Sequence, residues 1–144
     1  MRRAALLVVA VVFAGCGGGD DRLSRDEYAS KADTICAKYQ RRTEGARSAR
    51  TTDALARAAD RTLAAFEDAT RELEKLNPPE SEEELVRRWF AQLDVLKQDV
   101  ERIRDRARAG DLQGVRELAP LGLEHNRRAN QLAARLGMRV CSEG

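Results

Sequence analysis

The sequence predicts an all-α fold, an antiparallel up-down-up-down four-helix bundle that occupies residues 23–144 as one domain. Charged residues make up 35% of the 144 residues and aromatic residues only 4%, a balance that suits long solvated helices around a thin core of leucine and alanine. Apolar residues recur three and four positions apart in four successive segments, with short turns between them. Helices of similar length joined by short turns favour antiparallel neighbours in a bundle.

The first two helices have recognisable starts and ends. Ser24, followed three residues later by Glu27, predicts a capping box at the start of the first helix. The chain turns into the second helix near Thr51, and Asn77-Pro78-Pro79 ends it, because proline excludes the helical conformation from the residue before it. The side chains expected to face inward are Tyr28, Ala32, Ile35, Tyr39 and Ala46 on the first helix and Leu55, Ala59, Leu63, Phe66, Leu73 and Leu76 on the second.

The third and fourth helices are bounded by similar signals. Ser81 with Glu84 predicts a second capping box. Gly110 ends the third helix, Asp111 caps the fourth, and Gly137 ends the fourth. The inward side chains are expected to be Leu85, Trp89, Leu93, Leu96, Val100, Ile103 and Ala107 on the third helix and Val115, Leu118, Gly122, His125, Ala129, Leu132 and Leu136 on the fourth.

Residues 1–15 predict a signal peptide. Met1-Arg2-Arg3 is positively charged, and Ala4 to Ala14 is an uncharged apolar run of 11 residues. This run is far shorter than the ~20 residues that a helix needs to span a bilayer. The sequence therefore predicts an export signal and not a permanent membrane span.

The end of this signal, Phe13-Ala14-Gly15-Cys16, resembles the lipobox of bacterial lipoproteins, with Phe13 where leucine is usual. The resemblance implies that Cys16 is diacylglycerylated and that the peptide is cut just before it, and two acyl chains give stable anchoring. Residues 16–22 would then be the lipidated cysteine and a flexible tether, Gly17-Gly18-Gly19-Asp20-Asp21. The alternative is an ordinary signal peptide cut nearby, but a flexible polar segment directly after the cysteine favours an anchored domain.

Cys36 and Cys141 remain in the part of the chain that is expected to be exported. An oxidising compartment favours a disulfide between them, and closing so long a loop is worth ~4–5 kcal/mol. The alternatives are two free thiols or a metal site, for which two cysteines without neighbouring ligands are poorly suited. In the bundle Cys36 lies level with about Arg127, so the segment after Gly137 must double back by ~14 Å. Residues 137–141 are long enough to do so.

Several short motifs together resemble a family of small uncharacterised lipoproteins of GC-rich bacteria. The resemblance implies the helical bundle and the Cys36–Cys141 pair, and it implies no activity. Pro120 and His125 are not among the resembling features. These features are the lipobox with Cys16, Tyr28 and Ala32 ahead of Ile35-Cys36, Leu76-Asn77-Pro78-Pro79, Ala109-Gly110-Asp111, and Leu136-Gly137-Met138 shortly before Cys141.

The charge balance argues against a nucleic-acid partner. The formal charge of +2 comes from Arg2 and Arg3 of the signal peptide, which leaves 24 basic against 24 acidic residues in the mature chain. Arginines do gather at the end of the bundle away from the anchor, where an anionic cell-wall polymer or an acidic protein would fit them. The alternative is a solvated face that stabilises helix C-termini. The cluster comprises Arg41, Arg42, Arg47 and Arg50 on the first helix and Arg102, Arg104, Arg106 and Arg108 on the third.

His125 is the one histidine of the chain and falls on the inward stripe of the fourth helix. As a ligand-binding residue it would lie with Tyr39 in a core pocket opened by the kink at Pro120. As a structural residue it would be hydrogen-bonded to Tyr39 or Thr62. No metal is expected, because di-metal bundles use Glu-x-x-His pairs and position 122 is glycine, and no positioned nucleophile indicates an enzyme.

The aromatic residues are expected to pack and not to bind. Trp89 and Phe66 have matched heights on neighbouring helices, which predicts an aromatic core pair in place of a ligand stack.

The favoured function is that of a lipoprotein anchored on the extracytoplasmic face of the cell membrane, a non-catalytic interaction or scaffold module of the cell envelope without a cofactor. Its expected partners are the membrane, through the lipid, and an envelope protein or anionic cell-wall polymer. The alternative is a small-ligand-binding lipoprotein with its site in the bundle core near His125 and Pro120. A filled core would favour the first function, and a cavity lined by His125 and Tyr39 the second.

Overall fold

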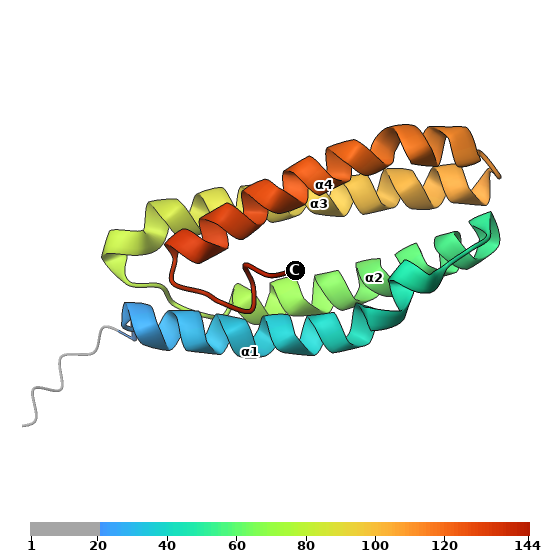
Figure 1. Ribbon diagram of the computed structural model, residues 1–144. Helices are drawn as coiled ribbons and strands as arrows, with labels where there is room; N and C mark the ends of the chain where they lie inside the picture. Colours follow the sequence, from blue (N-terminus) through green and yellow to red (C-terminus); the bar gives the residue numbers. More distant parts are fainter. Residues whose placement is uncertain (1–20) are drawn as a thin grey trace, which may run out of the picture.

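The computed structural model describes residues 21–144, so the expected signal peptide, Cys16 and most of the tether lie outside the described residues. Within residues 21–144 the protein is an all-α bundle without strands, as the sequence predicts. Four long helices alternate in direction along one axis, and short 3-10 turns precede α2 and α3 (Figure 1). The elements are α1 (Arg25–Thr43), η1 (Glu44–Ser48), α2 (Thr52–Leu73), η2 (Glu80–Glu82), α3 (Glu83–Arg108) and α4 (Leu112–Arg135).

Three predicted helix starts are confirmed together with their caps. The Ser24 hydroxyl accepts the Glu27 amide at 3.3 Å, and the Glu27 carboxylate accepts the Ser24 amide at 2.9 Å. The Ser24 hydroxyl also donates to the Glu27 carboxylate at 2.6 Å, and this bond together with that from the Ser24 amide holds the pKa of Glu27 below its usual value. The side chains of Thr51 and Asp111 likewise each accept a backbone N–H in the first turn of α2 and of α4.

Both predicted glycine stops are confirmed, and both glycines have a left-handed backbone, with φ of 70° at Gly110 and 82° at Gly137. At the end of α4 the amide of Gly137 donates to the Ala134 carbonyl at 3.0 Å, and the amide of Met138 donates to the Ala133 carbonyl at 3.1 Å. This pair of bonds is a Schellman motif, which satisfies carbonyls that the helix leaves unpaired. The chain after α4 is thereby turned back toward the bundle.

The predicted capping box at Ser81 is wrong. Ser81 lies inside η2, and the residue that precedes α3 is Glu82, which has helical dihedral angles and no side-chain cap. The turn starts directly after Pro79, whose backbone is extended at φ −63° and ψ 145°. A residue already inside a helical turn cannot adopt the extended conformation of an N-cap, so Ser81 is unable to serve as one.

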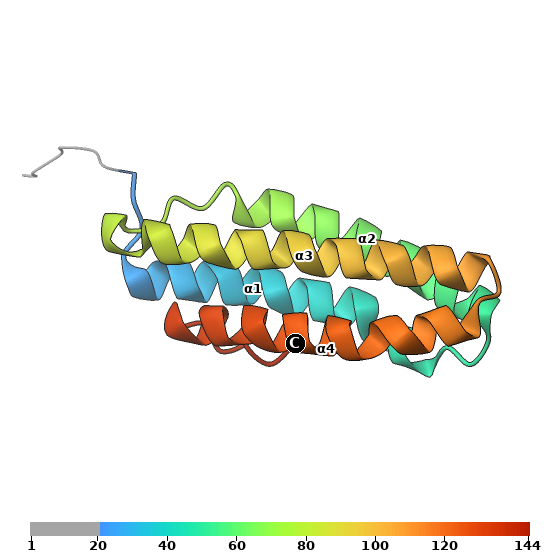
Figure 2. The same cartoon turned by 90° about the horizontal axis from the view of Figure 1, so that it is seen from above.

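The bundle consists of two helix pairs joined through α2 and α3. Helices adjacent in sequence pack closely on each other, whereas the backbones of α1 and α4, which would close the ring, lie farther apart and meet through buried side chains and the bond from Arg25 to the Arg135 carbonyl. The chain after α4 runs back between them, and the far end of α4 extends beyond it (Figures 1 and 2). We call residues 139–144 the C-terminal strap.

The buried core has two parts. The larger part lies toward the end where α1 begins, and its largest fully buried side chains are Tyr28, Trp89, Leu136 and Met138. The smaller part lies at the opposite end, which we call the far end, and is built around Ala56, Ala107 and Val115.

The predicted core pair of Trp89 and Phe66 is wrong. Trp89 packs on Phe90, with ring centroids 5.5 Å apart, and Phe66 packs edge-on against Tyr39 at 6.0 Å. The ion pair between Glu67 and Lys97, at 3.0 Å, gives the reason. It places residue 67 of α2 level with residue 97 of α3, which is two helical turns away from residue 89.

Candidate functional site

The predicted pairing of Cys36 with Cys141 is confirmed, because their Sγ atoms are bonded at 2.10 Å. Cys36 lies near the middle of α1, and Cys141 lies in the C-terminal strap. The disulfide therefore attaches the strap to α1 in the manner that the sequence predicts. Both cysteines are half-buried, and Cys141 packs against the larger part of the core.

The side of α1 that faces the strap binds its main chain. The Asp33 carboxylate accepts two strap amides, that of Arg139 at 2.9 Å and that of Cys141 at 3.0 Å. One turn beyond Cys36, the Gln40 amide donates to the carbonyl of Val140 at 3.0 Å. Hydrogen bonds in which a charged carboxylate is the acceptor are among the stronger ones in proteins. Asp33 therefore makes the strongest polar contact between α1 and the strap.

Helix α4 binds the other side of the same segment. The amide groups of Asn126 and Asn130 both donate to the carbonyl of Gly144, at 2.7 and 3.0 Å. The spacing of four residues puts these two asparagines on one face of α4. Sequence reasoning placed the strap on α1 and missed these asparagines, although two amides at helical spacing were a usable signal.

His125 has a buried partner that the sequence reasoning missed. Its Nδ1 lies 2.6 Å from the Oδ2 of Asp99 on α3, and Asp99 is only 3% exposed. Arg102 reaches the other carboxylate oxygen of Asp99 at 3.4 Å. The predicted hydrogen bond from His125 to Tyr39 or Thr62 is therefore wrong. Asp99 is not among the side chains expected to face inward, yet it is three residues from Leu96, on the face of α3 that packs against α4.

Tyr39, the second residue of the expected ligand site, has a different neighbourhood. Its ring packs edge-on against Phe66, and burial raises the pKa of its hydroxyl. Tyr39 and His125 thus make their contacts with different residues, on α2 and on α3 respectively. Pro120 is exposed, inside α4. The contacts of these three residues do not converge on one site.

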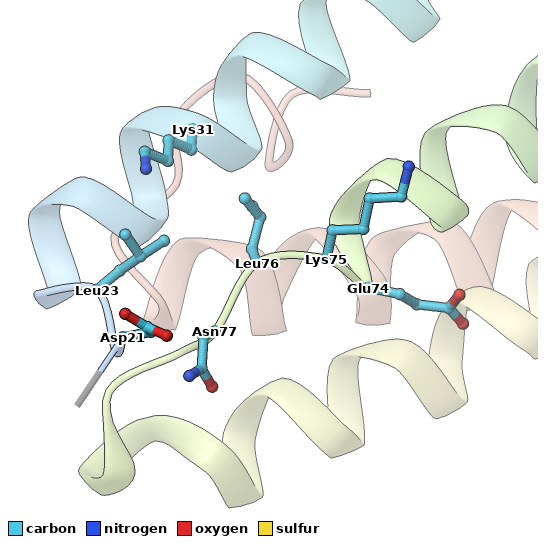
Figure 3. A pocket seen from close by; sticks show the side chains of 7 residues that line it. All are labelled: Asp21, Leu23, Lys31, Glu74, Lys75, Leu76 and Asn77. Atoms are coloured by element: carbon cyan, nitrogen blue, oxygen red, sulfur yellow. The ribbon is translucent and has the colours of Figure 1, made fainter. Parts of the chain in front are cut away.

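One surface hollow lies where the described chain enters the bundle. Its volume is about 490 Å³, and it is lined by residues from the start of α1 and from the segment after α2. Figure 3 shows Leu23 and Leu76 on its apolar side, and the Glu74 side chain extending away from the other lining residues. The backbone amide of Leu23 donates to the Asn77 carbonyl at 2.9 Å, which fixes this edge. The remaining lining residues are Asp21, Lys31 and Lys75, whose charges are of both signs.

The second hollow lies at the far end, between η1 and the start of α2. Its volume is about 260 Å³. Alanine side chains form much of its wall, and the arginines Arg50 and Arg61 stand at its edge, both exposed.

Most arginines of the predicted far-end cluster have acidic partners. Arg42 pairs with Asp68 and Arg108 with Asp60, in both cases at 2.8 Å and between two helices. These pairs reduce the positive charge that the cluster presents to a partner. The further pairs are Arg102 with Asp99, Arg104 with Asp105 and Arg106 with Asp111.

The exposed large apolar side chains lie on α4, in the half that extends beyond the strap. Leu123 is 72% exposed, Leu121 50% and Leu112 46%. Leu112 and Leu123 are separated by about three helical turns, and Leu123 and Asn130 by about two. The two leucines therefore lie on the face of α4 that carries Asn126 and Asn130. Where the strap no longer covers this face, its leucines are in contact with solvent.

Comparison with protein-family models, with curated protein sequences and with solved structures finds no match for this chain. The helices within residues 21–144 lack the combination of length and apolar character that a membrane-spanning helix requires. In the same residues, no three acidic, histidine or cysteine side chains come together as a metal-binding group.

Proposed function

We propose that the mature protein is a lipid-anchored helical bundle on the extracytoplasmic face of the cell membrane, where it acts as a non-catalytic interaction or scaffold module of the cell envelope. The observation that carries this proposal is the sequence Phe13-Ala14-Gly15-Cys16 at the end of an apolar run of 11 residues, followed directly by three glycines. Two acyl chains on Cys16 would hold the protein stably on a bilayer.

The end of the bundle at which the described chain begins supports a role at a distance from the membrane surface. Residues 17–21 reach at most ~17 Å when fully extended, which would keep the start of α1 close to the bilayer. The far end would then stand away from the membrane by the length of α3, which at 26 residues is ~39 Å. The exposed leucines of α4 and the exposed Arg41 and Arg50 lie toward that end and are the surface we assign to an envelope protein or an anionic cell-wall polymer.

The chemistry of the reactive side chains supports a non-catalytic role. Cys36 and Cys141 are joined in a disulfide and are not available as thiolate nucleophiles. The imidazole of His125 is hydrogen-bonded through Nδ1 to Asp99. This bond gives the buried carboxylate of Asp99 the partner that a buried polar group needs, which is a structural role for His125.

The test is membrane fractionation of cells that carry the full chain, with metabolic labelling by palmitate. We expect wild-type protein to fractionate with membranes and to carry the label. Cys16→Ala should carry no label and accumulate with an uncleaved signal. Phe13→Leu is the matched control, because it restores the usual lipobox residue and should be processed at least as well as the wild type. An unlabelled wild-type protein, or equal labelling of Cys16→Ala, would refute the proposal.

One observation favours the second function, a ligand site in the bundle core. The side chain of His125 is 24% exposed although it is bonded to the nearly buried Asp99, and at Gly122, one turn before it, an added Cβ would meet the Asp99 side chain at 4.0 Å. A small ligand held there would appear as an added mass in native mass spectrometry of protein taken from its own membranes. That mass should disappear in His125→Ala and remain in Tyr39→Phe if the imidazole is the ligand-binding group.

A further inference from the structure

We propose that the C-terminal strap is a redox-released closure: reduction of the Cys36–Cys141 disulfide by a dithiol frees the strap and opens the groove between α1 and α4, while the four helices stay folded. The strap bridges these two helices along the stretch that lies beyond their shared core. Releasing it would therefore uncover the faces of α1 and α4 that bind it, without breaking the helix pairs or that core.

The bonds that hold the strap, apart from the disulfide, are individually replaceable by water. Asp33 and Gln40 on α1 bind its amides and one carbonyl, and Asn126 and Asn130 on α4 bind the carbonyl of Gly144. All these partners in the strap are main-chain atoms. The bonds between neutral groups contribute little net stability each, because the separated groups bond to water instead, and the two bonds to the Asp33 carboxylate contribute more.

The strap has little apolar burial to keep it in place. Val140, Cys141 and Ser142 are half-buried, and Arg139 and Glu143 are exposed. Its internal order is limited to turn bonds, such as that from the Glu143 amide to the Val140 carbonyl at 3.3 Å. The conformational entropy that residues 139–144 regain on release opposes docking, so the covalent bond decides whether the strap stays closed.

The release should stop at Met138. This side chain is 1% exposed in the larger part of the core, and its amide is bonded in the Schellman motif that ends α4. Leu136, Trp89 and Tyr28, the other large buried side chains, belong to helices or helix ends and not to the strap. The hinge therefore lies directly after Met138, and the helical core survives the opening.

The redox step is a thiol–disulfide exchange. A thiolate of the dithiol attacks one sulfur of the disulfide, and the other cysteine leaves as a thiolate and takes up a proton. The second thiol of the reductant then displaces the mixed disulfide and leaves as the oxidised, disulfide form of that reductant. The protein gains two electrons and two protons, and the reductant loses the same number.

Opening uncovers the four side chains that bind the strap's main chain. Asp33 and Gln40 would line one wall of the groove, and Asn126 and Asn130 the other. The groove would continue past the former position of Gly144 toward the exposed Leu123 on the same face of α4.

Hydrogen exchange measured by mass spectrometry on the full chain, before and after treatment with dithiothreitol, tests this inference. We expect the amides of residues 139–144 to exchange roughly tenfold faster or more after reduction, while amides in the middle of α2 and α3 change less than about twofold. The double variant Cys36→Ser/Cys141→Ser should reproduce the reduced pattern without a reductant. Dithiothreitol on the folded oxidised protein provides the same comparison if that variant does not accumulate.

Leu55→Ala is the matched control, because it weakens the far end of the bundle and leaves the disulfide intact. It should leave the strap protected. The inference is overturned by strap amides that remain equally protected after reduction, by loss of protection in α2 and α3 to the same degree as in the strap, or by a disulfide that dithiothreitol does not reduce in the folded protein.

Discussion

Tyr28 carries a hydroxyl that the fold buries without a hydrogen bond, and removing it should stabilise the protein. The side chain is 1% exposed, and its hydroxyl has no hydrogen-bond partner among the described residues. A buried polar group left unsatisfied costs about 1–3 kcal/mol. Tyr28→Phe keeps the ring in the core and removes this cost. We expect the free energy of unfolding at pH 7 to rise by about 1 kcal/mol, and Tm by roughly 3–6 °C.

The same hydroxyl gives a pH dependence with a definite sign. Burial raises the pKa of Tyr28 from 10.0 to about 12. As the pH rises above 10, the unfolded chain releases this proton before the folded protein does, so wild-type stability falls between pH 10 and 12. The full difference is worth about 2–3 kcal/mol. Tyr28→Phe has no such group and should lose correspondingly less stability in this window.

Urea unfolding followed by the fluorescence of Trp89, at pH 7 and in steps up to pH 11.5, measures both effects. Tyr39→Phe is the control, because Tyr39 is only half-buried, and it should give a smaller gain at pH 7. A loss of more than about 1 kcal/mol at pH 7 in Tyr28→Phe would mean that the hydroxyl is hydrogen-bonded after all. Equal alkaline slopes for wild type and Tyr28→Phe would refute the pKa argument.

Three further tests concern the packing of the core, the backbone at the end of α4 and the buried pair of His125 and Asp99. Leu136→Ala should cost about 2–5 kcal/mol, and Leu123→Ala less than about 0.5 kcal/mol, because Leu136 is 1% exposed and Leu123 72%; equal costs in urea unfolding would contradict the core. Gly137→Ala should cost about 1–2 kcal/mol through its φ of 82°, and an unchanged Tm would argue against the left-handed turn. A double-mutant cycle of His125→Ala and Asp99→Ala should give a coupling above about 0.5 kcal/mol; additive effects would mean that the two side chains do not interact.

The fold was predictable because its signals are local. The capping box of Ser24 and Glu27 and the glycine stops at Gly110 and Gly137 depend only on residues within one helical turn. The start of α3 was not predictable from Ser81, because Pro79 begins a 3-10 turn before that residue and the pattern of a capping box does not reveal an earlier turn.

The tertiary contacts were harder, because they depend on the register between helices. The position of Phe66 along α2 relative to Trp89 on α3 was off by two turns, and so the aromatic pairs were assigned wrongly. The partner of His125 was missed for a related reason, since Asp99 is a charged residue outside the apolar stripe from which the core of α3 was predicted. The Cys36–Cys141 pair was predictable because the chain has three cysteines and the expected lipidation of Cys16 leaves two to pair.

The most direct test of the account is the intact mass of the protein extracted from its own membranes under non-reducing conditions. The account predicts a chain that begins at a diacylglyceryl-modified Cys16 and is two hydrogens lighter than its reduced form. A chain that begins at another residue and carries no lipid would contradict the proposed anchoring, whatever the state of its disulfide.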